Sequence, residues 1–202
     1  MRLSEPARVR VFVAVDLAAA VHQAVVRVKA ELAQVRSDVR WVRDEGLHAT
    51  MKFLGSISPA QLDAVHDAVS HAAAPIGCFA VRARGLGAFP SLERPRVLWV
   101  GLEGAPLVEL AGALDDALAP LGFARETRPF HPHVTLGRVA GRRGWQAVER
   151  VLQDHWNDDF GISHVDHIIT YRSELRKGGS LYSPLWTTAL ADSTKGEDYG
   201  TR

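Results

Sequence analysis

Two short stretches of this chain repeat one side-chain pattern, and they constrain its fold more than any other feature. Residues 48–51 read His-Ala-Thr-Met and residues 133–136 read His-Val-Thr-Leu. In a β-strand, alternate side chains share a face, so the histidine and threonine of each stretch point one way and the apolar residues the other. The sequence therefore predicts two strands that each present an imidazole and a hydroxyl on one face, brought to a common site.

The apolar periodicity around these stretches predicts alternating strands and helices. Strands are expected at residues 9–17, 78–89, 96–102, 165–171 and 181–190, and helices where apolar residues recur at helical spacing, at residues 21–35, 58–72, 106–118 and 145–152. The order of helix, histidine strand, helix and hairpin occurs twice, the first time after a leading strand. We expect one two-lobed domain over residues 1–191, with both histidines in the cleft between the lobes, and a disordered polar tail over residues 192–202.

The composition and charge of the chain limit the partners and the cellular compartment that are expected for it. The chain of 202 residues has a formal charge of +1, so any nucleic acid has to be held by a local basic patch. Cys78 is the single cysteine, which is typical of a reducing compartment and excludes an intramolecular disulfide. No stretch approaches the roughly 20 apolar residues of a membrane helix. A soluble, cytoplasmic protein with no membrane partner is expected.

The paired motifs and their flanks resemble the 2H phosphoesterase superfamily, most closely its RNA 2′,3′-cyclic phosphodiesterase (2′-5′ RNA ligase-like) branch. The flanks that match are residues 11–15, 41–42, 171–175 and 182–185, so the resemblance covers residues 9–190. It implies an α+β fold of two mostly antiparallel sheets with pseudo-two-fold symmetry around a central cleft, with the helices outside. It also implies metal-independent hydrolysis, without a cofactor, of a 2′,3′-cyclic phosphate at RNA or nucleotide ends to a 2′-phosphomonoester, together with reversible 2′-5′ RNA ligation.

The chemistry explains why two histidines are needed. One group has to take a proton from the attacking water while another gives a proton to the departing ribose oxygen, and an imidazole with an ordinary pKa of ~6.5 can do either. By the resemblance, His48 is the proton donor and His133 the proton acceptor. Thr50 and Thr135, each on the face of its histidine, are expected to donate hydrogen bonds to the non-bridging phosphate oxygens.

Four further residues are candidates for binding substrate. Arg138 suits a phosphate, but strict alternation places it opposite His133, so it reaches the groove only if the strand ends or bulges there. Trp41 and Phe89 lie next to predicted loops and are candidates for the groove wall. Lys52 shares the face of His48 on simple alternation, so it either meets the phosphate or is an ordinary lysine at a sheet edge.

Two other interpretations stay open on the sequence. His131 and His133, aided by His164 and His167, form a candidate metal site, although no cluster of acidic or cysteine residues supports it. A non-catalytic module that binds RNA ends or nucleotides is the other alternative, but binding alone does not need an acid–base pair. The expected partners are RNA ends or small nucleotides that carry a 2′,3′-cyclic phosphate, bound by a monomer.

Overall fold

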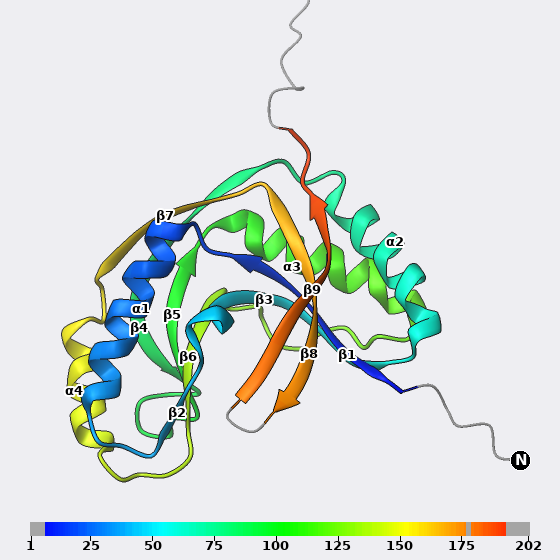
Figure 1. Cartoon of the computed structure of the whole chain (residues 1–202). Coiled ribbons are helices and arrows are strands. Elements are labelled where there is room, and N and C mark those ends of the chain that lie inside the picture. Colours follow the sequence, from blue (N-terminus) through cyan, green and yellow to red (C-terminus); the bar gives the residue numbers. More distant parts are fainter. Residues whose placement is uncertain (1–6, 177–178, 193–202) are drawn as a thin grey trace, which may run out of the picture.

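The computed structural model describes residues 7–176 and 179–192, and within them one strongly curled antiparallel sheet runs through the molecule (Figure 1). The strand order is β7-β4-β5-β6-β3-β1-β8-β9, and the short strand β2 pairs with β6. The strands are β1 (Val9–Asp16), β2 (Val39–Trp41), β3 (His48–Ile57), β4 (Phe79–Phe89), β5 (Val97–Glu103), β6 (His133–Val139), β7 (Asp159–Val165), β8 (His167–Arg176) and β9 (Gly179–Ala189).

The sheet consists of two halves that meet at one point. One half contains β3, β1, β8 and β9, and the other contains β6, β5, β4 and β7. A single registered pair, Ala49 with Val134, joins β3 to β6. The two sheets expected from the sequence are therefore continuous through this pair. Both residues are buried in the core, at 1% and 0% exposure, so the joint is fixed by packing as well as by backbone pairing.

The helices cover the outer, apolar side of the sheet. Helices α1 (Ala19–Gln34) and α4 (Trp145–Asp154) pack on the half that contains β4 and β7, whereas α2 (Leu62–Ala73) and α3 (Ala105–Leu118) pack on the half that contains β3 and β9 (Figure 1). The apolar stripe of α1, which includes Val21, Val25 and Leu32, is almost completely buried. The inner side of the curled sheet is left open and carries both polar and aromatic side chains.

Most of the expected elements are present, and the differences are local. The four predicted helices form, and the start predicted at Ser58 is a capping box in which Ser58 and Gln61 satisfy each other. The edge strand β7 was not predicted, because Asp159 and Gly161 are poor strand formers; the strand forms by pairing with β4, with a register shift at Phe160 and a positive φ at Gly161.

Two further predictions concern the C-terminal tail and membrane-spanning helices. The tail predicted for residues 192–202 lies, beyond Asp192, outside the described residues. Of the helices in the described ranges, none combines the length and the apolar character that crossing a membrane requires.

Candidate active site

The two histidine strands meet at the joint of the sheet, with their polar faces on the same side. Because Ala49 and Val134 point into the core, their neighbours on each strand point into the groove. His48 and His133 occupy diagonal positions across this antiparallel pair, which are typically about 7–8 Å apart. These positions bring the two imidazoles from neighbouring strands to one groove.

A β-bulge follows each motif and reverses the faces of the residues after it. In β3, Ala14 pairs with Thr50 and Val13 with Lys52, so Met51 is the extra residue. In β6, the register skips Leu136 in the same way. A bulge interrupts the alternation of side chains. The two motifs therefore share a backbone device as well as a sequence.

The bulges determine which residues after each motif face the groove between the two histidine strands. Arg138 lies beyond the bulge of β6 and lines the groove together with His133 and Thr135, which is the condition that alternation alone did not meet. Phe53 takes the corresponding place on β3 and is 65% exposed. At this position β6 therefore carries a cation, whereas β3 carries an aromatic ring.

The expectation that Lys52 shares the face of His48 is wrong, because the bulge at Met51 turns Lys52 to the other side. Lys52 is only 8% exposed, and its ammonium group pairs with the Asp115 carboxylate at 2.5 Å and donates to the Ala124 carbonyl at 2.5 Å. The lysine borders the larger cavity but is held by α3 and the segment that follows it. Its charge is compensated within the protein.

Two hollows share lining residues at the histidine strands; both histidines line the larger one, and His48 also lines the smaller one. The larger cavity, of about 710 Å³, extends past Phe89, Phe130 and α3. The second, of about 340 Å³, runs along β1 and the β8–β9 hairpin, and we call it the hairpin groove. Residues from both motifs line both hollows: His48, Thr50, Phe53, Thr135 and Arg138. The two histidine strands therefore lie where the hollows meet.

The environment of His133 sets its tautomer. Its Nδ1 lies 2.7 Å from the His131 carbonyl oxygen, which only accepts hydrogen bonds, so Nδ1 carries the proton and Nε2 has the free lone pair of the neutral ring. Burial lowers the pKa of His133, the His131 carbonyl opposes this, and the charges of His131 and Arg138 lower the pKa further. Phe89 packs edge-on against the ring, with centroids 4.9 Å apart.

His48 lies in an aromatic cage. Phe12 and Tyr171 are stacked on it at centroid distances of 4.9 and 5.8 Å, and Tyr182 meets it edge-on at 5.2 Å. Burial lowers the pKa of His48 to about 4, while the negative charge of Asp16 acts in the opposite direction. Asp16 is the register partner of His48 on β1 and accepts a hydrogen bond from the Tyr171 hydroxyl at 2.7 Å.

The turn that leads into His48 is tied to α1. Lys29 is 7% exposed, and its ammonium group donates to the Val42 carbonyl at 2.7 Å and pairs with Asp44. The His22 ring donates to the Asp44 carbonyl at 2.8 Å. Asp44 begins the short 3-10 helix η1 (Asp44–Gly46), which ends two residues before the start of β3. This network fixes the entry of the first histidine strand.

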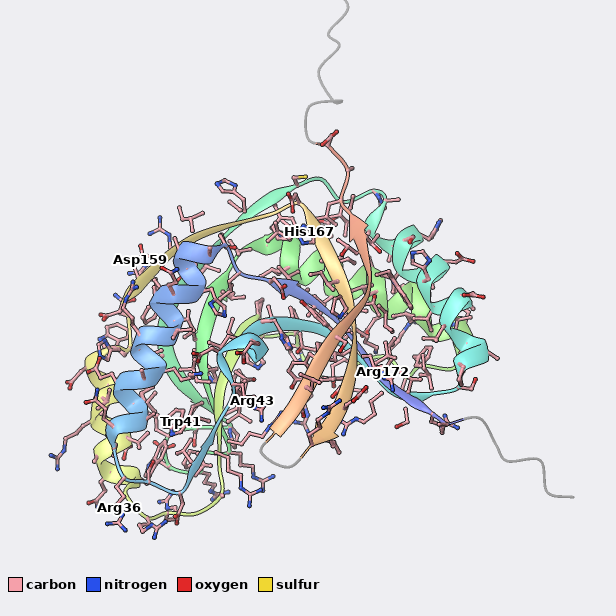
Figure 2. All side chains as sticks on the ribbon, viewed as in Figure 1. Arg36, Trp41, Arg43, Asp159, His167 and Arg172 are labelled. Carbon is pink, nitrogen blue, oxygen red and sulfur yellow. The ribbon has the colours of Figure 1, made fainter. Side chains whose placement is uncertain are left out.

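The structure separates the two aromatic candidates. Phe89 lines the larger cavity beside His133. Trp41 borders neither hollow and instead packs beside β6 (Figure 2), where it pairs with Gly137. A Cβ at Gly137 would lie 3.0 Å from the Trp41 ring and 2.8 Å from Val39, so the glycine admits this close approach.

The other histidines do not assemble a metal site. Across residues 7–176 and 179–192, no three side chains of His, Cys, Asp or Glu converge in a way that could hold a metal ion. His167 contacts Asp166, and His164 lies on the edge strand β7 opposite Ala80.

Sequence reasoning missed the residues that surround His48. Phe12, Asp16 and Tyr171 were not predicted as site residues, although alternation along residues 9–16 places Arg10, Phe12, Ala14 and Asp16 on one face. The alternation along β1 is therefore sufficient to predict that these side chains share a face. It does not show that this face is turned toward the histidines.

The curled sheet with two imidazoles converging at its centre defines a 2H phosphoesterase. A model of LigT-like phosphoesterases matches residues 15–99 and again residues 100–182, so that each match contains one His-x-Thr motif. The chain belongs to the LigT-like phosphoesterase family.

Its relatives cover almost the whole chain. The RNA 2′,3′-cyclic phosphodiesterase of Aeropyrum pernix is 32% identical over 169 residues, which is 83% of this chain and 95% of the relative. A crystal structure of a Thermus thermophilus protein superposes with a TM-score of 0.77 at 27% identity, covering 91% and 99% of the two chains. Escherichia coli LigT complexed with 3′-AMP gives a TM-score of 0.76 at 27% identity, covering 92% and 99%.

Proposed function

We propose that this protein hydrolyses 2′,3′-cyclic phosphates at RNA or nucleotide ends to a 2′-phosphomonoester. We propose that reversible 2′-5′ ligation uses the same groove, with the 5′-hydroxyl of a second RNA end attacking the cyclic phosphate in place of water. The observation that carries the proposal is the convergence of His48 and His133, each with its threonine, on one groove at the joint of β3 and β6. The name of the Aeropyrum pernix relative and the 3′-AMP in the E. coli LigT crystal support the substrate class.

In this reaction the two imidazoles act on opposite sides of phosphorus. Nε2 of His133 takes a proton from water, whose oxygen forms the new bond to phosphorus. The bond from phosphorus to the ribose 3′-oxygen breaks, and His48 gives that oxygen its proton. The phosphate stays on the 2′-oxygen. A second proton transfer through solvent returns both histidines to their starting states.

The neighbouring charges support this assignment of the two roles. Arg138 and His131 place positive charge near His133, which favours the neutral ring that a base requires. Asp16 places negative charge near His48, and a bound cyclic phosphate adds another. Both charges favour the imidazolium that a proton donor requires, against the burial that lowers its pKa in the free protein.

The non-bridging oxygens of the reacting phosphate carry the negative charge that the groove has to stabilise. We propose that the hydroxyls of Thr50 and Thr135 donate hydrogen bonds to these oxygens, and that the Arg138 guanidinium adds a charge-assisted contact. All three side chains line both hollows, so they surround the position between the imidazoles. Phe89 supplies an apolar wall on the side of the larger cavity.

We further propose that the two-lobed domain of residues 1–191 acts as a monomer in the cytoplasm. One chain supplies both imidazoles and both threonines of the groove, so a single copy holds the complete acid–base pair.

Product analysis on an oligonucleotide that ends in a 2′,3′-cyclic phosphate tests the proposal. The wild-type protein should leave the phosphate on the 2′-hydroxyl, and His48→Ala or His133→Ala should each lower turnover by about 10²–10⁴-fold. His71→Ala is the matched control, because His71 lies exposed on α2 and lines neither hollow, so this variant should retain activity.

Three outcomes would contradict the proposal. Full activity of either histidine variant would show that the reaction does not use these two histidines as its acid–base pair. Tight binding of the oligonucleotide without any product would indicate a binding module. Loss of activity in a chelator, restored by added metal, would indicate a metal-dependent hydrolase.

A further inference from the structure

The hairpin groove has the character of an anion site. Two arginines, Arg10 and Arg138, line it together with the hydroxyl-bearing residues Ser173, Ser180 and Tyr182. None of the described residues that line this groove is an aspartate or a glutamate. A concave surface with two guanidinium groups, several hydroxyls and no carboxylate attracts negative charge.

Arg10 has no role in the fold that would explain its position. It lies on the groove face of β1, in register with Ser173 on β8 and Ser56 on β3. Among the residues that the structure describes, its guanidinium makes no hydrogen bond or ion pair. The nearby arginines differ: Arg8 donates to the Ser56 carbonyl at 2.7 and 3.2 Å, and Arg172 (Figure 2) pairs with Glu174 at 3.1 Å.

The distance along β1 separates Arg10 from the reacting phosphate. Thr50, which faces that phosphate, is in register with Ala14, four residues from Arg10. Four residues of a strand span about 13 Å between Cα atoms. Because Thr50, Thr135 and Arg138 already surround the reacting group, the guanidinium of Arg10 is placed for a second anion, at the other end of a nucleotide.

We propose that the hairpin groove binds the phosphate on the 5′ side of the nucleotide whose cyclic phosphate reacts, with Arg10 as its main ligand. This inference rests on the proposed function and specifies the substrate of that same site. An internucleotide phosphodiester of RNA and a terminal 5′-phosphate of a small nucleotide share the required chemistry. The nucleobase is then left to the larger cavity.

The first test compares three substrates: adenosine 2′,3′-cyclic phosphate, the same nucleotide with a 5′-phosphate, and an adenosine dinucleotide that ends in the cyclic phosphate. The 5′-phosphate should raise kcat/KM about tenfold or more, because a guanidinium–phosphate contact is a strong, charge-assisted one. A matching gain for the dinucleotide identifies the RNA phosphodiester as an equivalent ligand, and a gain for the mononucleotide alone restricts the ligand to terminal phosphates.

Arg10→Gln should reduce this preference to less than about threefold, since the amide keeps hydrogen-bond donors but loses the charge. Arg8→Gln is the control, because Arg8 lies two residues away but is bound to a backbone carbonyl, and it should keep the wild-type preference. Equal kcat/KM values for all three substrates in the wild-type protein, or an unchanged preference in Arg10→Gln, would overturn the inference while leaving the proposed function intact.

A second measurement does not depend on turnover. By calorimetry, the wild-type protein should bind adenosine 2′,5′-bisphosphate about tenfold or more tightly than adenosine 2′-phosphate, and Arg10→Gln should bind the two within about threefold. If no cyclic phosphate is hydrolysed but this difference in affinity is found, the proposed function fails and the anion site stands. Equal affinities in the wild-type protein would refute the site.

Discussion

Acid should destabilise this protein partly through His48, and the structure indicates by how much. The folded protein holds the pKa of His48 at about 4 by burial, whereas the unfolded chain has the ordinary value of about 6.5. Between these values the unfolded state binds a proton that the folded state does not, so stability falls as the pH falls. The contribution is fully present above about pH 6.5. Its total loss below pH 4 is about 3 kcal/mol, of which about 2 kcal/mol is lost by pH 5.

Urea unfolding of the wild-type protein and of His48→Gln at pH 7.5, 6.5, 5.5 and 5 measures this contribution. The variant lacks the titrating group, so its stability relative to wild type should improve by about 2 kcal/mol between pH 7.5 and pH 5. Burial also lowers the pKa of His133, but that contribution is present in both proteins and cancels in the difference.

His71→Gln is the matched control, since His71 lies exposed on α2. This variant should follow the wild-type pH dependence. Parallel stability curves for the wild-type protein and His48→Gln, within about 0.5 kcal/mol over this pH range, would refute the reasoning that burial keeps His48 neutral.

Three further predictions follow from individual contacts. Asp115→Asn leaves the buried ammonium group of Lys52 without its counter-ion and should cost about 3 kcal/mol in urea unfolding; a loss below about 1 kcal/mol would show that the Ala124 carbonyl alone is sufficient. Thr135→Val keeps the shape of the side chain but removes its hydroxyl, so kcat/KM should fall by about 10²–10³-fold with unchanged stability, and an unaltered rate would remove Thr135 from the mechanism. Gly87→Ala would place a Cβ 2.3 Å from the Trp99 ring, so the melting curve should indicate a loss of about 1–3 kcal/mol, and a stability equal to wild type would mean that the ring moves freely.

Local sequence patterns were sufficient for the elements of the fold. The four helices follow from apolar residues at helical spacing, because each helix buries one stripe of its own surface. The edge strand β7 was missed for the opposite reason. Its extended shape depends on hydrogen bonds to β4, which lies far away in the sequence. The two halves of the sheet were expected, but not their continuity through Ala49 and Val134.

Long-range packing decided the surroundings of the site. Asp16 and Tyr171 lie far apart in the sequence, and only the pairing of β1 with β3 and β8 brings both to His48. The position of Trp41 next to a loop suggested that it forms part of the groove wall. Its pairing with Gly137 instead places it outside both hollows.

The His-x-Thr repeat by itself determined the two strands, the shared face of each histidine with its threonine, and the family of the chain. Strand alternation is a property of the local backbone, so four residues suffice to predict it. The tertiary structure decided everything beyond the fourth residue of each motif. The bulges at Met51 and Leu136 turn Lys52 away from the face of His48 and bring Arg138 to the face of His133. A bulge exists only in relation to a partner strand, and the partners β1 and β5 are distant in sequence.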